Sequence, residues 1–199
     1  MPIPSARTTF VVLTAPLRLF PGEPLVLFAE REFSRAAKGG LGHAKTSANY
    51  AHQYLPTWRA KEAGCDAVLW LDAETHERIE EASTMNIFMV IGEELVTPSL
   101  QDTILSGITR RSIITLARER HELKVVERPI TLTEVAKAIK EGTLTEAFTA
   151  STALQIRPIA RIVNRERNID FPQETPWMDR LRRDLDAIQR GGVPAGVRR

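Results

Sequence analysis

The sequence is short of several residue types that define common protein classes. Among its 199 residues there is one cysteine, Cys65, which excludes a disulfide framework and a CxxC redox or zinc pair. A chain with a single thiol suits a reducing compartment, so we expect a cytoplasmic protein in which Cys65 is a small buried apolar group. The formal net charge of +2 is too small to indicate a nucleic-acid partner.

Long apolar runs and metal-binding patterns are also missing. No apolar run approaches the roughly 18 residues of a membrane-spanning helix, so no membrane partner is expected. The nearest run, residues 8–20, is interrupted by Pro16 and Arg18, and we interpret residues 8–14 as a buried strand rather than a signal peptide. The four histidines show no spacing typical of metal ligands, so no metal site is expected: His43, His52, His76 and His121.

The composition is that of a globular domain, with 43% hydrophobic and 26% charged residues. Hydrophobic patterning predicts alternating strands and helices, and therefore a mixed α/β or α+β domain. The expected strands cover residues 25–30, 67–73, 78–82, 86–92, 93–99 and 124–130, and residues 144–162 are expected to form a strand, a turn and a second strand. The expected helices cover residues 49–63, 109–120, 131–142 and 175–192, with glycine at several ends.

The stretch "GLGHAKTSANYAH" at 40–52 places Lys45 among small, uncharged side chains. An amine becomes a catalyst when it can lose its proton near neutral pH, and small neighbours let a reacting group approach it closely. The usual use of such a lysine is a Schiff base with a carbonyl, most often that of pyridoxal phosphate. A solvated surface lysine is the ordinary alternative.

Pyridoxal phosphate needs two further kinds of group, and the chain has candidates for both. A carboxylate keeps the pyridine nitrogen protonated, and Glu81 precedes a predicted strand among small residues. Backbone N–H groups at a helix start bind phosphate, and "SGITRR" at 106–111 offers such a start, while "TASTA" at 149–153 adds a run of small hydroxyl residues. Taken singly, Tyr50 would be a core residue and Glu81 a surface one.

Five stretches in order resemble the branched-chain amino acid aminotransferases, which are fold-type IV pyridoxal-phosphate enzymes: "GLGHAKTSANY", "GCDAVLWLD", "IEEASTMNIF", "LVTPSLQDTILSGITRRSI" and "KVVERPIT…LTEAFTASTA". The resemblance runs from about residue 7 to residue 191. The lysine-x-x-x-asparagine-tyrosine spacing and the "STMN" sequence favour this family over its relative 4-amino-4-deoxychorismate lyase.

The resemblance implies a catalytic role for Lys45, which would form the Schiff base and move the proton between the substrate Cα and the cofactor. It implies that Tyr50 hydrogen-bonds the phenolic oxygen of the cofactor and that Glu81 contacts its pyridine nitrogen. Glu80 is the neighbouring alternative to Glu81, and we place it outside the site.

Five more positions are matched by the same resemblance. Thr84 would lie close to the cofactor ring, and Ile108 and Thr109 would form the helix start that binds the phosphate. Thr152 would contact the phosphate, and Ala153 would bind the substrate carboxylate.

The resemblance also has departures. Residues 1–33 look like the remnant of an N-terminal small domain and its connection, and residues 34–199 look like the C-terminal cofactor-binding domain. "TASTA" stands where the family has a glycine-rich "GSGTA" loop, and Ser106 stands where a proline would precede Gly107. Loss of these glycines removes backbone freedom near the phosphate.

The implied function is transamination between branched-chain L-amino acids and 2-oxoglutarate, giving 2-oxo acids and glutamate. The family's sites assemble in dimers, so a homodimer is expected. The alternatives are a truncated domain that binds cofactor or dimerises without catalysis, and the lyase named above.

Overall fold

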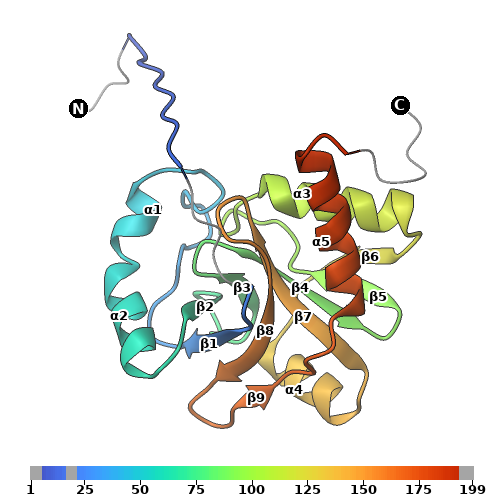
Figure 1. Cartoon of the computed structure of the whole chain (residues 1–199). Helices are drawn as coiled ribbons and strands as arrows, with labels where there is room; N and C mark the ends of the chain where they lie inside the picture. The colour runs from blue at the N-terminus through green and yellow to red at the C-terminus, as the bar shows by residue number, and fades with distance from the viewer. Residues whose placement is uncertain (1–5, 17–21, 193–199) are drawn as a thin grey trace.

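A computed structural model describes residues 6–16 and 22–192, and Figure 1 shows their arrangement. Nine strands form one continuous sheet in the order β3-β2-β1-β8-β7-β4-β5-β6, with β9 paired to β8. The strands are β1 (Leu25–Glu30), β2 (Ala67–Leu71), β3 (Ile79–Ala82), β4 (Asn86–Ile91), β5 (Glu94–Thr97), β6 (Lys124–Glu127), β7 (Leu144–Ser151), β8 (Gln155–Val163) and β9 (Ile169–Asp170). The helices are α1 (Ala48–Ala51), α2 (Tyr54–Glu62), α3 (Ile108–Thr115), α4 (Leu132–Lys140) and α5 (Pro176–Gln189), and a π-helical turn, η1 (Leu116–Arg120), continues α3.

The sheet is mixed, which confirms the expected mixed α/β fold. Strand β1 runs parallel to both β2 and β8, and β5 runs parallel to β6. The other neighbours are antiparallel, including the long pairing of β4 with β7. The nine-residue strand β8 joins the two halves of the sheet, because it pairs with β1 on one side and β7 on the other.

Helices cover the sheet in three places, each with its own apolar cluster (Figure 1). Helix α2 packs on β1 and β2 over a small cluster that contains Cys65 and Trp70. Helices α3 and α5 pack on β7 over a second cluster, in which the rings of Phe88 and Phe148 are stacked. The largest cluster includes residues of α4 and of most strands. Cys65 is buried, as the sequence predicted.

Local sequence signals explain where the helices begin and end. The Thr131 hydroxyl accepts a hydrogen bond from the Glu134 N–H at 3.1 Å, which caps the start of α4. Gly142 follows that helix with a φ of 69°, and Gly64 follows α2 with a φ of 72°. Both glycines adopt the left-handed conformation that commonly ends a helix.

Two predictions about local structure are wrong. Residues 8–14 do not form a buried strand: residues 6–16 are exposed and contain no strand or helix. Their β-branched pattern fits a strand, but the sheet offers them no partner among the described residues. The helix expected over 49–63 is divided into α1 and α2 at His52 and Gln53.

None of the helices in the described part of the chain is both long and apolar enough to cross a membrane. The predicted boundary between residues 33 and 34 stays a prediction. Strand β1, which lies before that boundary, is paired with β2 and β8 inside the main sheet.

Candidate active site

The loop that carries Lys45 is held by Asn49 at the start of α1. The Asn49 side-chain amide donates hydrogen bonds to the carbonyls of Leu41 at 2.7 Å and Ala44 at 2.8 Å. Asn49 is itself buried, and its backbone carbonyl accepts a hydrogen bond from the Gln53 side chain. The asparagine of "AKTSANY" therefore fixes the turn from which the Lys45 side chain extends.

Gly42 allows this turn to pack closely against another loop. A Cβ atom at Gly42 would lie 2.6 Å from the Asp102 carbonyl oxygen and from the Thr103 Cα, which are backbone atoms that cannot move aside easily. The His43 N–H also donates to the Asp102 carbonyl at 2.8 Å. Only glycine permits this approach, so the sequence places the lysine loop directly beside residues 102–103.

Lys45 and Tyr50 lie close together at the start of α1. The Lys45 Nζ is 3.1 Å from the Tyr50 hydroxyl and 5.4 Å from the centre of its ring. Lys45 is exposed and Tyr50 is half-buried. The amine is therefore open to a reacting molecule and already has a polar neighbour within hydrogen-bond reach.

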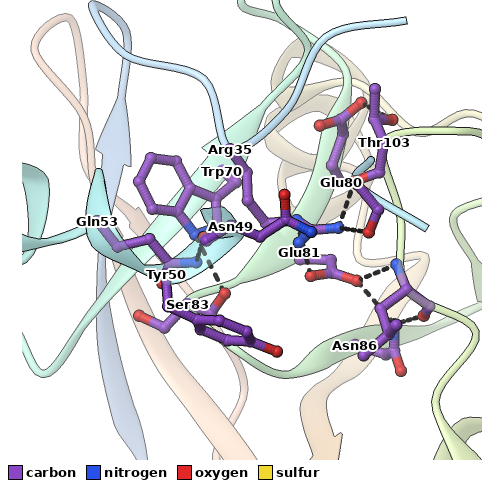
Figure 2. Close-up of polar contacts among 12 residues, drawn as sticks. Arg35, Asn49, Tyr50, Gln53, Trp70, Glu80, Glu81, Ser83, Asn86 and Thr103 are labelled. Atoms are coloured by element: carbon purple, nitrogen blue, oxygen red, sulfur yellow. Dashed lines mark hydrogen bonds and ion pairs between the residues drawn. The ribbon is translucent and has the colours of Figure 1, made fainter. Parts of the chain in front are cut away.

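Glu81 is a buried carboxylate in an ion pair with Arg35 (Figure 2). Both side chains are 4% exposed, and the Arg35 Nε lies 3.0 Å from the Glu81 Oε2 but out of line for a hydrogen bond. The other end of the Arg35 guanidinium donates to the carbonyls of Gly42 and Thr103. Arg35 thus connects Glu81 to both loops described above.

Burial dominates the acidity of Glu81. Loss of solvent raises the pKa of this carboxyl to about 7, against the opposing attraction of Arg35, the Leu105 N–H and the more distant Lys45. The adjacent Glu80 raises the pKa further. Glu81 can therefore change its protonation state near neutral pH, and a cation placed next to it would favour the charged form.

The second Glu81 oxygen faces the loop that leads into α3. Its Oε1 accepts hydrogen bonds from the Leu105 N–H at 2.7 Å and from the Asn86 amide at 3.3 Å. The Asn86 amide also donates to the Leu105 carbonyl at 2.9 Å. Helix α3 begins at Ile108, directly after Gly107, and no side chain caps its start. Its first N–H groups suit an anion.

The remaining predicted residues lie in two turns and at the start of α3. Thr84 is exposed in the turn between β3 and β4. Ile108 begins α3 and is 59% exposed, whereas Thr109 is buried. Thr152 and Ala153 are exposed in the turn between β7 and β8. The roles predicted for these five residues remain predictions.

The Glu80 side chain points to the opposite face of β3 from Glu81, as successive residues of a strand do. Its Oε1 accepts a hydrogen bond from the Thr103 hydroxyl, and its Oε2 is buried with no hydrogen-bond partner. Glu80 therefore faces the other side of β3, where the prediction placed it outside the site.

Sequence reasoning did not identify Arg35 or Asn86. Arg35 pairs with a residue 46 positions further along the chain, and no local pattern reveals such a partner. Asn86 belongs to the "STMN" stretch, but the resemblance assigned it no role. Its place at the first position of β4, after a tight turn, was the available signal.

These residues fit pyridoxal phosphate. An exposed amine lies beside a phenol, a buried carboxylate faces cationic groups, and an uncapped helix start adjoins that carboxylate. In the ranges 6–16 and 22–192 there is no cluster of three His, Cys, Asp or Glu side chains that could hold a metal ion.

Comparison with known proteins agrees with this geometry. The mitochondrial branched-chain-amino-acid aminotransferase of Bos taurus is 38% identical over an alignment of 199 residues. The alignment covers 94% of this chain and 50% of that protein. A solved branched-chain aminotransferase from Thermoproteus uzoniensis, with norvaline, has a TM-score of 0.75 at 27% identity and covers 89% of this chain and 55% of its own. The branched-chain amino acid aminotransferase from Thermobaculum terrenum in its PLP form has a TM-score of 0.71 at 28% identity, with coverages of 85% and 52%.

The chain spans about half the length of the curated relatives it matches. The family model for class IV amino-transferases matches residues 4–162, which include all the site residues described above. On this match and the shared fold, the chain belongs to the class IV aminotransferases.

Proposed function

We propose that the chain carries the cofactor site of a pyridoxal-phosphate-dependent transaminase acting on branched-chain L-amino acids and 2-oxoglutarate. The observation that carries this proposal is the Lys45–Tyr50 contact at 3.1 Å beside the buried Glu81 carboxylate. The relatives named branched-chain-amino-acid aminotransferase support the substrate class.

Bound pyridoxal phosphate would supply an electron sink for the carbanion formed at the substrate Cα. Lys45 would hold the cofactor and then move a proton to and from that carbon. Its exposed Nζ is free to approach both positions. Tyr50 would donate a hydrogen bond to the phenolic oxygen and orient the ring against Lys45.

Glu81 would keep a proton on the pyridine nitrogen, because its burial strengthens attraction to a cationic ring. Thr84 would pack near the ring, and Ile108 and Thr109 would bind the phosphate with their backbone N–H groups. Thr152 and Ala153 would close the phosphate and substrate-carboxylate side from the β7–β8 turn.

One observation favours a second candidate. The chain covers about half the length of its curated relatives, and the second candidate is a domain that would bind cofactor without catalysis. In that case it would be a cofactor-binding or dimerisation domain with impaired catalysis. We further propose a cytoplasmic homodimer that serves branched-chain amino acid biosynthesis, and light scattering of the purified chain would measure its oligomeric state.

The test is an absorbance titration of the purified chain with pyridoxal phosphate. We expect a visible band that borohydride removes and that is absent in Lys45→Ala. Lys38→Ala is the matched control, because this lysine lies on the same loop outside the site. No lysine-dependent band at saturating cofactor would reject Lys45 as the cofactor lysine.

A single-turnover assay with leucine then separates the two candidates. Conversion of the bound cofactor to its amine form, with release of one 2-oxo acid, would identify a transaminase. Binding without conversion would identify the impaired domain.

A further inference from the structure

We infer that Asn86 is a positioning residue that holds the Glu81 carboxylate and the start of α3 in one fixed arrangement. Through it, the groups that meet the ring nitrogen and the phosphate of one cofactor keep a constant separation. This inference rests on the proposed function for its ligand, and on the contacts of Asn86 for its geometry.

The first step is the pair of hydrogen bonds made by one amide group. The Asn86 Nδ2 donates to the Glu81 Oε1 at 3.3 Å and to the Leu105 carbonyl at 2.9 Å. The Leu105 N–H donates to the same Glu81 oxygen at 2.7 Å. Asn86, Leu105 and Glu81 therefore form a closed triangle, in which none of the three can move without breaking a contact (Figure 2).

Asn86 also packs against Gly107, the residue that precedes helix α3. A Cβ atom at Gly107 would lie 2.3 Å from the Asn86 Oδ1, which is closer than real Cβ contacts permit. The backbone of Gly107 has φ −65° and ψ 141°, which any residue can adopt. Glycine at this position is therefore required by the approach of Asn86 and not by the backbone conformation.

Asn86 itself is held by the pairing of strands β4 and β7. It is 6% exposed and opens strand β4, where it is paired with Ala150 of β7. Ala150 lies two residues before Thr152 in the turn proposed to close the phosphate side. The amide that contacts Glu81 and the loop before α3 is thus carried by the first residue of an interior strand that is paired on both sides.

The experiment is a double-mutant cycle on cofactor affinity with Gly107→Ala, Asn86→Ala and the double variant, measured by equilibrium dialysis with pyridoxal phosphate. Loss of a hydrogen bond to a charged group predicts a Kd roughly 10-fold or more higher for each single variant. We expect the double variant to match Asn86→Ala alone, because the added methyl group then has no amide to displace. Gly22→Ala and Asn168→Ala are matched controls at surface positions.

A second readout needs no cofactor. A carbon-13 NMR titration of the Glu81 carboxyl in the cofactor-free chain should show a higher midpoint in Asn86→Ala, because the carboxylate loses a donor. Gly107→Ala should shift the midpoint in the same direction by displacing the amide. This variant keeps Asn86 and carries the test if Asn86→Ala does not fold.

Each outcome has one meaning. Unchanged Kd and unchanged midpoint in the variants would overturn the positioning role, and so would two single effects that multiply in the double variant. A wild-type chain with no lysine-dependent band would overturn the proposed function instead, and the NMR titration would still decide the role of Asn86.

Discussion

Two buried glutamates, one on the edge strand β3 and one on the interior strand β7, have similar burial but different partners. Glu81 on β3 and Glu146 on β7 are 3% and 1% exposed, and burial raises the pKa of both. Glu146 accepts the N–H groups of Trp177 at 2.8 Å and Met178 at 2.9 Å, one on each oxygen. Glu81 has one backbone donor and otherwise relies on side chains.

The difference separates a carboxylate that supports the fold from the one proposed to meet the cofactor. Glu146 satisfies two of the N–H groups that the first turn of α5 cannot pair internally, so it acts as a helix cap from a neighbouring strand. Each of its two carboxylate oxygens accepts a backbone hydrogen bond that stabilises the fold. Glu81 faces Arg35 and, further away, Lys45, which leaves it able to exchange partners when a cationic ligand binds.

The largest effect is expected from Arg35→Met. Removal of Arg35 leaves the buried Glu81 carboxylate without its cationic partner, which costs about 3–5 kcal/mol of unfolding free energy. Urea denaturation at pH 8 measures this loss, and at pH 5 it should be smaller because Glu81 is then protonated. Exposed Arg167→Met is the control. A loss equal at both pH values would contradict the charged pair.

The next effect is the pH dependence of the wild-type chain. The folded pKa of Glu81 is raised to about 7, so the folded state binds a proton more tightly than the unfolded state. The stabilisation from this group is present below about pH 4.3 and is lost as the pH rises through 7, by roughly 3–4 kcal/mol in total. Urea denaturation between pH 4.5 and 8 should show this decline.

Glu81→Gln serves as the control for that pH profile. It should remove most of the decline, because its side chain does not titrate. A profile equally steep in this variant would assign the decline to other groups, such as Glu146.

A smaller effect is expected from Glu146→Gln. The new amide can accept only one of the two helix N–H groups and turns a donor toward the other, which predicts a loss of about 1–3 kcal/mol. Cofactor affinity should not change, since the Glu146 carboxylate contacts the start of α5 and none of the proposed cofactor residues. Exposed Glu141→Gln is the matched control. A weaker cofactor affinity in Glu146→Gln would remove the distinction between the two glutamates.

The smallest effect is expected from Glu80→Gln. Glu80 is buried with one oxygen unpartnered, and burial raises its pKa. The Thr103 hydroxyl can still donate to the amide oxygen, and removal of the charge offsets the new unpaired N–H group. We expect a change in unfolding free energy within about 1 kcal/mol. A large loss in urea denaturation would show that the Glu80 charge has a partner of its own.

The sequence predicted most elements of this fold because their signals are local. The apolar run at 25–30 became β1, and Thr131 and Gly142 bound α4 as their chemistry indicates. Residues 8–14 carry an equally good strand pattern and are exposed. A pattern of β-branched residues indicates what a segment can pair with, and it does not indicate that the partner is present.

The site was predictable only in part, for a similar reason. Lys45 and Tyr50 are five positions apart, so their contact follows from one turn of chain. The environment of Glu81 is assembled from Arg35, Asn86 and Leu105, which reach it from a loop, a strand and a second loop. Such a convergence depends on tertiary packing, and single residues do not encode it.

The exposed stretch from Phe10 to Leu13 has a practical consequence for anyone who handles this chain. Phe10 is 87% exposed and Leu13 is 90% exposed, with two valines between them, on an extended segment outside the sheet. An exposed segment with apolar side chains and no strand partner is a template for intermolecular β-pairing. We therefore expect aggregation to increase with protein concentration and with sulfate salts. The substitution Val12→Lys should reduce this aggregation.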